Sequence, residues 1–199
     1  MTEYKKLNNY TGWFTFLIAL IVYSITVEDT ASFWDAGEFI AVSNKLEVPH
    51  PPGAPFYLLL GRFFSFFAFG NLENIALAIN FLSVLSSSFT ILFLFWTITH
   101  ITSKIIKTDT FSNTLLVLLS GLTGALSFTF TDSFWFSAVE AEVYAMSSFF
   151  TAFVFWAILR WESTEDASYQ NRWIILIAYM MGLSIGVHLL NLVAIPALA

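Results

Sequence analysis

Long apolar runs dominate the sequence, and they constrain its fold more than any other feature. A helix needs about 20 apolar residues to cross a bilayer. Of the 199 residues, 57% are hydrophobic and 11% are charged, and a soluble globule of this size could not bury so much apolar surface. The sequence therefore predicts an all-α integral membrane protein, a polytopic transmembrane helical bundle of about five spans. The predicted spans are 11–27, 75–102, 113–131, 134–159 and 173–199.

The first run is predicted to be a retained span. Lys5 and Lys6 precede it, as in a signal peptide, but the following stretch YSITVEDTASFWD offers no clear cleavage site of small residues. The last run reaches residue 199 without a polar tail, so we expect residues 1–199 to be the N-terminal portion of one longer membrane domain. The chain has no cysteine, which excludes a disulfide framework and a thiolate metal site.

The topology depends on the segment Phe56 to Gly70, which could cross the membrane or lie along it. It is short and carries Gly61 and Arg62 in its middle, features typical of a helix at the membrane interface. If it does not cross, six of the eight Lys and Arg residues fall on the cytoplasmic side with the N-terminus, as the positive-inside rule favours. The outer loop 28–74 is then predicted to hold two interfacial helices, on the same face as the turn at 131–135.

This outer loop contains two acids three residues apart, Asp35 and Glu38, in the stretch FWDAGEFIA. If the segment from Asp35 to Leu46 is helical, both carboxylates lie on one face. A partly desolvated carboxylate at a membrane surface can take a proton from a hydroxyl nucleophile. The alternative is that both are ordinary solvated acids of an outer loop.

The stretch VPHPPGAP follows, and its prolines predict a stiff corner that holds His50. His50 is either part of a structural corner or a ligand contact. Arg62, in the Phe-rich segment after it, could extend to lipid headgroups or could hold a phosphate.

A second polar passage, DSFWFSAVEAEVYAM, places Glu140 and Glu142 six and eight residues into the predicted span 134–159. Acids at that depth are costly and are candidates for function. On a helix Glu140 and Tyr144 would share a face. Alternatively, the helix begins only after Glu142, and both acids lie at the interface.

In the last run His188 and Asn191 would share a helical face toward the outer leaflet. A single histidine in a span is most often a hydrogen-bond partner between helices. Known zinc-protease, phosphate-loop and hydrolase signatures are absent from the sequence. Basic patches for nucleic acid are absent too, so we expect no nucleic-acid partner.

The order of these parts resembles the opening of the GT-C superfamily of membrane glycosyltransferases, and most closely its protein O-mannosyltransferase-like branch. The resemblance is carried by DAGEFIA and HPPGAPFYLLLGRFFSFFAFG between the first and second predicted spans, and it covers about residues 11–96. FWFSAVEAEVYAM and GLSIGVHLLNL resemble later segments of that family.

The resemblance implies transfer of a sugar, expected to be mannose, from a polyprenyl-phosphate donor to Ser or Thr hydroxyls of a translocated protein. Asp35 would be the general base, and Glu38 would orient the acceptor or Asp35 itself. His50 and Arg62 would be candidates for the donor phosphate. Glu140, Glu142, Tyr144, His188 and Asn191 would complete the substrate site.

The family generally needs no bound metal or other cofactor, although the paired acids leave a divalent ion possible. Lipid, donor and protein acceptor are thus the expected partners, and the periplasmic face of a bacterial inner membrane is the expected site of action. A different hypothesis is a transporter or a non-catalytic scaffold, in which Glu140, Glu142 and His188 line a polar path across the membrane.

Overall fold

The computed structural model describes residues 3–189 and 191–192, and all of its regular elements are helical. This confirms the predicted all-α fold. Five long helices form the bundle, and shorter ones lie in the connections. The long helices are α1 (Glu3–Ile25), α4 (Ile75–Ile105), α5 (Phe111–Thr129), α7 (Val143–Glu162) and α8 (Ala167–Ile185). The short ones are α2 (Ala36–Lys45), α3 (Pro55–Ser65), η1 (Phe66–Ala68), η2 (Leu72–Asn74) and α6 (Asp132–Ala138).

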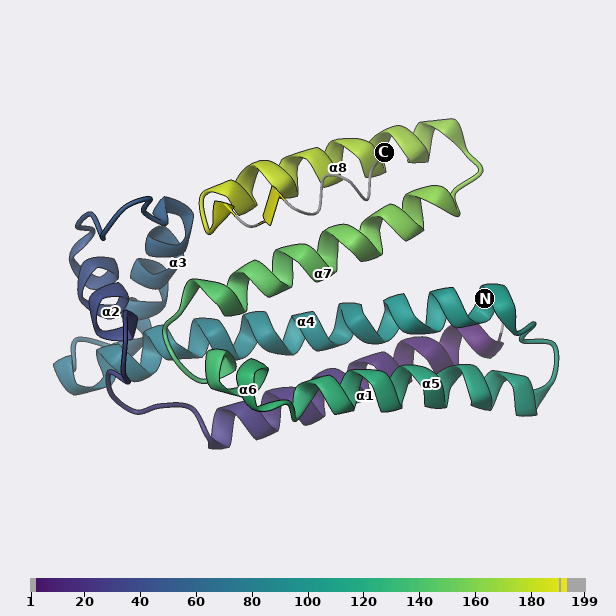
Figure 1. The fold of residues 1–199 in the computed structure, drawn as a ribbon, viewed down its shortest axis with the longest axis horizontal. Coiled ribbons are helices and arrows are strands. Elements are labelled where there is room, and N and C mark those ends of the chain that lie inside the picture. Colours follow the sequence, from purple (N-terminus) through teal and green to yellow (C-terminus); the bar gives the residue numbers. More distant parts are fainter. Residues whose placement is uncertain (1–2, 190, 193–199) are drawn as a thin grey trace.

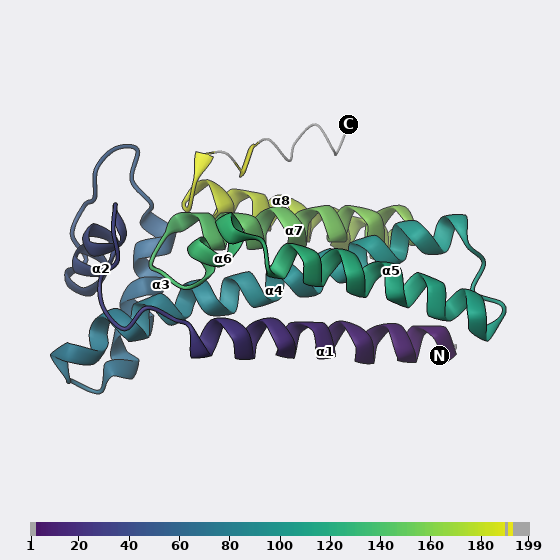
Figure 2. The same ribbon diagram turned by 60° about the horizontal axis from the view of Figure 1, so that its bottom comes forward.

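The long helices run alternately up and down, and α4 is the central one (Figures 1 and 2). Helix α4 packs against α1, α5 and α7, while α8 packs mainly against α7 at the edge of the bundle. Side chains cap the starts of two of the long helices: Thr110 accepts a hydrogen bond from the backbone of Asn113, and Asp166 accepts one from Ser168. These caps satisfy backbone donors that have no partner within the helix.

Three helices in the described part are long and apolar enough to cross a membrane. They are α4 with the turn before it (Leu72–Ile105), α5 and α7. Helices α1 and α8, also predicted as spans, are not among them, since polar residues occupy their first turns. The count of five spans therefore stays a prediction, and the predicted range 173–199 extends into residues 193–199, outside the described residues.

The apolar run 134–159 was predicted to be one span, but it does not form one continuous helix. Helix α6 ends at Ala138, Glu142 has extended backbone angles of −132° and 146°, and α7 begins at Val143. The long helix therefore begins only after Glu142, as the alternative interpretation held, while the position of the two acids relative to the membrane stays a prediction. The break at residues 139–142 has a physical advantage, because it keeps two carboxylates out of the apolar length of a helix.

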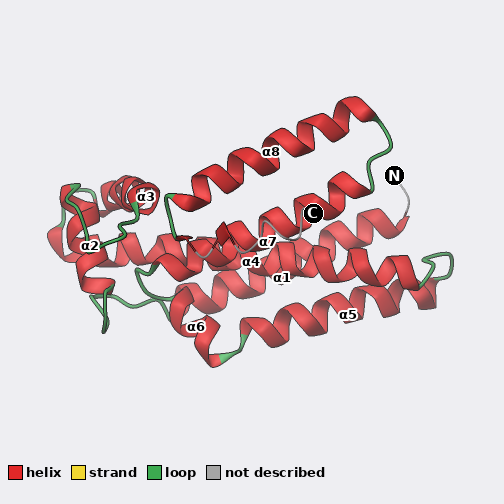
Figure 3. Ribbon diagram, turned by 45° about the horizontal axis from the view of Figure 1, so that its top comes forward, coloured by secondary structure: helices red, strands yellow, loops and turns green. Residues whose placement is uncertain are grey.

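Helices α2 and α3 lie at one end of the bundle, which we call the α2–α3 end (Figure 1). Helix α1 finishes there and α4 starts there, so residues 26–74 do not run through the bundle. Figure 3 shows α3 across the long axis of the bundle. The break at 139–142 and the last turn of α8 reach the same end.

A buried cluster fixes α2 and α3 to the bundle. Phe39 of α2 and Tyr57 of α3 pack with Leu82 of α4 and Met146 of α7. Burial of each such side chain contributes about 1.5–3 kcal/mol. The two short helices also approach closely, because a Cβ on Gly61 would meet Oγ of Ser43 at 2.5 Å.

The opposite end of the bundle carries most of the cations, and we call it the basic end. The N-terminus, the α4–α5 connection and the α7–α8 connection lie there (Figure 1). Six of the eight Lys and Arg residues belong to these parts: Lys5, Lys6, Lys104, Lys107, Arg160 and Arg172.

Candidate active site

The N-terminal part of α2 meets the proline corner through Glu38 and His50. The backbone N–H of His50 donates to Oε1 of Glu38 at 2.8 Å, and Nδ1 of His50 lies 2.8 Å from Oε2. On the other side of the ring, Nε2 is 4.0 Å from Oδ2 of Asp35. Asp35, Glu38 and His50, which the sequence predicted as site residues, are thus brought together.

Local backbone geometry places these groups. Asp35 stands at the N-cap of α2, and Glu38 follows one turn later on the same face. The Asp35 carboxylate makes no capping hydrogen bond, so it is not engaged by the backbone of α2. Gly53 turns the corner with a φ of 80° and donates its N–H to the carbonyl of His50 at 3.0 Å.

The electrostatics of this contact favour an ion pair. The hydrogen bonds from His50 lower the pKa of Glu38, and the same contact with Glu38 raises the pKa of His50. Glu38 is therefore held as an anion and His50 as a cation over a widened pH range. Asp35, with 55% of its side chain exposed, is more accessible than Glu38, with 36%.

The break between α6 and α7 adds two buried acids to the same end. Glu140 and Glu142 are 4% and 6% exposed. The pKa of Glu142 is raised to about 7, mainly by burial and in part by the negative charges of Glu140 and Asp35. Because Glu142 also acts electrostatically on His50, the break belongs to the same charged region as α2.

Hydrogen bonds connect the segment before α2 to this break. Ser32 donates to the carboxylate of Glu140, and the N–H of Glu28 donates to the carbonyl of Val139 at 2.9 Å. Asn80 of α4 donates to the carbonyls of Glu28 and Thr30 at 2.6 and 3.0 Å. Acids about a hundred positions apart in the chain are therefore held at one site.

Sequence reasoning missed Tyr57 and Ser32. Tyr57 is fully buried, and the hydroxyl group that acts on its own hydroxyl is that of Ser83 in α4. Burial, followed by the negative charge of Glu142, raises the pKa of Tyr57. A single polar tip within FYLLL was the available signal for Tyr57, whereas nothing in the sequence marked Ser32.

Arg62 does not join this cluster. Its Nη1 donates to the carbonyl of Asn44 and, at 3.0 Å, to the side-chain oxygen of Asn44. The guanidinium also lies 4.8 Å from the centre of the Phe66 ring. Asn44 is nine residues beyond Asp35, about 14 Å along a helix, so Arg62 serves the C-terminal end of α2.

Tyr144, His188 and Asn191 lie at the same end, but not on the helical faces that were predicted. Tyr144 and His188 have ring centres 5.6 Å apart. Glu140 precedes α7, so it does not share a helical face with Tyr144, and α8 ends before His188 and Asn191. Asn191 accepts a hydrogen bond from Ser147 at 2.5 Å and donates to the carbonyl of Ser184 at 3.0 Å. Asn191 therefore ties the start of α7 to the end of α8.

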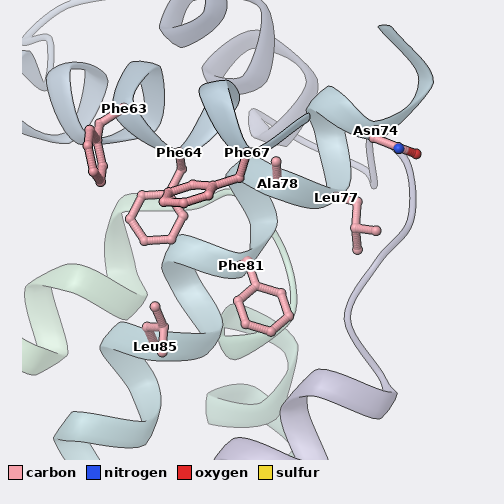
Figure 4. A pocket seen from close by; sticks show the side chains of 8 residues that line it. All are labelled: Phe63, Phe64, Phe67, Asn74, Leu77, Ala78, Phe81 and Leu85. Atoms are coloured by element: carbon pink, nitrogen blue, oxygen red, sulfur yellow. The ribbon is translucent and has the colours of Figure 1, made fainter. Parts of the chain in front are cut away.

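An apolar groove of about 490 Å³ lies between α3 with η1 and the first part of α4 (Figure 4). The rings of Phe63, Phe64 and Phe67 face the same space as Phe81 and Leu85. The groove adds an apolar surface at the α2–α3 end of the bundle.

The cluster of Asp35, Glu38 and His50 is also the part of the described chain that could share a cation. One ligand atom from each lies within 4.8 Å of the others. Within this group, Nδ1 of His50 is already in close contact with Oε2 of Glu38, at 2.8 Å.

Comparison with known proteins identifies the family. The family model for the N-terminal domain of protein O-mannosyl-transferase TMEM260 matches residues 35–199. Protein O-mannosyl-transferase tmem260 of Dictyostelium discoideum is 30% identical over 142 residues, which is 69% of this chain and 15% of that protein. Protein O-mannosyl-transferase TMEM260 of Mus musculus is 25% identical over 165 residues, 82% of this chain and 21% of that protein.

The chain thus spans roughly a fifth or less of the length of these relatives. No solved structure matches it significantly. The predicted resemblance to O-mannosyltransferases is confirmed, and the match begins at Asp35 itself. The chain belongs to the family of the protein O-mannosyl-transferase TMEM260 N-terminal domain.

Proposed function

We propose that this chain contributes the catalytic first loop of a GT-C-type protein O-mannosyltransferase. The enzyme would transfer mannose from a polyprenyl-phosphate donor to a Ser or Thr hydroxyl of a translocated protein. The names of the relatives support sugar transfer to a protein. The observation that carries the site is the gathering of Asp35, Glu38 and His50 beside the buried acids of the α6–α7 break.

Asp35 is the general base in this proposal. The two hydrogen bonds from His50 and the lowered pKa make Glu38 a weak proton acceptor. Asp35 has no such bond and is accessible. It would take the proton of the acceptor hydroxyl as the acceptor oxygen bonds to the sugar and the bond between sugar and phosphate breaks.

Glu38 and His50 position this base. Their contact holds the proline corner against α2, and the positive charge of His50 faces Asp35 across 4.0 Å. An imidazolium here can attract the negative phosphate as it leaves. Arg62 remains a second candidate for the phosphate only if it leaves Asn44.

The site would face away from the cytoplasm. The six cations at the basic end, opposite α2 and α3, support a cytoplasmic N-terminus by the positive-inside rule. The alternative of a polar path through the membrane is less well supported, since Glu140, Glu142 and His188 are all near the α2–α3 end.

The test is transfer of radiolabelled mannose from its polyprenyl phosphate to an acceptor peptide by the full-length protein in membranes. We expect Asp35→Asn to lower the rate by about 10²-fold or more, as for loss of a general base. Asp29→Asn, an exposed acid of the same loop, is the matched control and should retain the rate. Undiminished transfer by the Asp35 variant would remove it as the base.

A further inference from the structure

A polar recess of about 580 Å³ opens at the basic end of the bundle, between α1, α4 and the end of α7. Lys5 and Asn8 line it from α1, His100 from α4, and Arg160 from α7. The candidate active site lies at the other end of these helices, so the recess is a separate feature and does not depend on the proposed function.

The recess brings polar groups into the length of the bundle. On α4 its lining extends from Trp96 to Ser103, seven positions or about 10 Å along a helix. Nε2 of His100 lies 3.2 Å from Oγ of Ser163. Polar side chains that face a cavity in a membrane helix are candidates for ligand contact.

One buried polar atom of the recess lacks a partner. The side-chain oxygen of Asn8 is inaccessible and accepts no hydrogen bond from the described residues. Buried polar atoms of this kind are uncommon. Because this oxygen has no accessible surface, it is not itself a contact for a ligand in the recess.

The charge of the recess is positive, although the whole chain has a formal charge of −6. Lys5 and Arg160 are the two Lys or Arg residues among the eleven that line it, and none of the eleven is acidic. Neither cation forms a salt bridge within the described residues; at this end Lys104 pairs with Glu162 at 2.6 Å instead. Two cations without an acidic partner indicate an anionic ligand.

The position of the recess identifies the kind of anion. It lies where α4 and α7, two helices able to span a membrane, come to their ends. Trp96 and Trp156, with ring centres 5.7 Å apart, line its inner part, and tryptophan is enriched at the level of the lipid headgroups. Basic pockets between membrane helices bind phosphate headgroups.

We propose that this recess binds the headgroup of an anionic phospholipid, with Lys5 and Arg160 at the phosphate. Phosphatidylglycerol, which has both a phosphodiester and free hydroxyls, is the probe of choice. The experiment measures lipid binding to the full-length protein by native mass spectrometry after titration with phosphatidylglycerol or phosphatidylcholine.

We expect wild-type protein to prefer phosphatidylglycerol and the double variant Lys5→Gln/Arg160→Gln to bind it about tenfold or more weakly. Lys107→Gln/Arg172→Gln is the matched control, because it removes two cations from the same end but outside the recess. It should leave the affinity within about twofold. The conservative variant Lys5→Arg/Arg160→Lys should retain binding.

Three outcomes would overturn the proposal. One is equal affinity for both lipids in the wild type, and another is equal loss in the recess and control variants, which would indicate general surface attraction. The third is displacement of phosphatidylglycerol by millimolar inorganic phosphate with no dependence on the lipid chains, which would indicate a free-phosphate site. Melting temperatures of all variants, measured alongside, show whether each one is folded.

Discussion

The Glu38 carboxylate contacts His50 twice, each time at 2.8 Å: Oε1 accepts a hydrogen bond from the backbone N–H, and Oε2 lies against Nδ1 of the ring. This relationship joins the first turn of α2 to the proline corner twelve residues later. It also separates the roles of the two acids of DAGEFIA. The Glu38 carboxylate holds the corner, and the Asp35 carboxylate remains exposed to solvent.

The pairing of Glu38 and His50 predicts a pH window of added stability. A histidine with a raised pKa stabilises the fold fully below its ordinary 6.5 and loses that effect as the pH rises through its folded pKa. A carboxyl with a lowered pKa stabilises above its ordinary 4.5 and loses that effect as the pH falls through its folded pKa. Both contributions are present between 4.5 and 6.5.

Glu38→Gln should therefore lower the melting temperature most within this window, by about 1–3 °C, and less on either side. Glu47→Gln, an exposed acid after α2, is the control. A deficit that stays constant from pH 4 to pH 8 would contradict the pairing.

The buried acid of the α6–α7 break, Glu142, predicts that the stability of the protein falls as the pH rises. The pKa of Glu142 is raised to about 7 from 4.5, so the folded protein holds a proton that the unfolded chain has lost between these values. Stability should fall as the pH rises from 4.5 to 7. Glu142→Gln should remove this fall and raise the melting temperature at pH 8 by a few degrees. An unchanged pH profile in this variant would mean that Glu142 is solvated.

Close contact between α2 and α3 predicts a strong effect at Gly61. A Cβ there would lie 2.5 Å from Oγ and 2.8 Å from Cβ of Ser43, so Gly61→Ala should destabilise the protein by about 1–3 kcal/mol. Gly182→Ala is the matched control, because this helical glycine has no atom within 4 Å of its Cβ position. That change should be neutral or slightly stabilising. Ser43→Gly should partly rescue the Gly61 variant.

Hydrogen bonds from Asn80 attach the segment between α1 and α2 to α4, and they predict a loss of stability when Asn80 is replaced. Its amide donates to two carbonyls, those of Glu28 and Thr30. Asn80→Leu leaves both without this donor and should cost about 1–3 kcal/mol. The segment between α1 and α2 should also become more sensitive to limited proteolysis. Asn171→Leu, at an exposed position of α8, should change neither measurement.

The sequence predicted α2 and its acids well because the signals were local. DAGEFIA has helix-compatible residues and puts Asp35 and Glu38 three apart, and the prolines after it define a corner regardless of tertiary contacts. The charge pattern predicted that Phe56 to Gly70 would not cross the membrane, and this stays a prediction; in the fold, α3 lies at the end where α1 finishes.

The sequence left open whether the helix is broken at residues 139–142 and could not decide between the two alternatives. Apolar residues continue on both sides of Glu140 and Glu142, so hydropathy alone extends the helix through them. Contacts distant in sequence decide the matter, since Ser32 and the backbone of Glu28 hold the break from the first loop. The same limit applies to Tyr57, whose significance comes only from its complete burial near Glu142.

The central claim is that the first loop and the α6–α7 break form one site, and cross-linking tests it most directly. The chain has no native cysteine, so Ser32→Cys/Glu140→Cys can be treated in membranes with a short reagent that joins two thiols. We predict efficient cross-linking of this pair and none of Ser32→Cys/Glu162→Cys, whose second position is at the basic end. Cross-linking of 32 with 162, or its failure between 32 and 140 when both thiols react singly, would contradict the account.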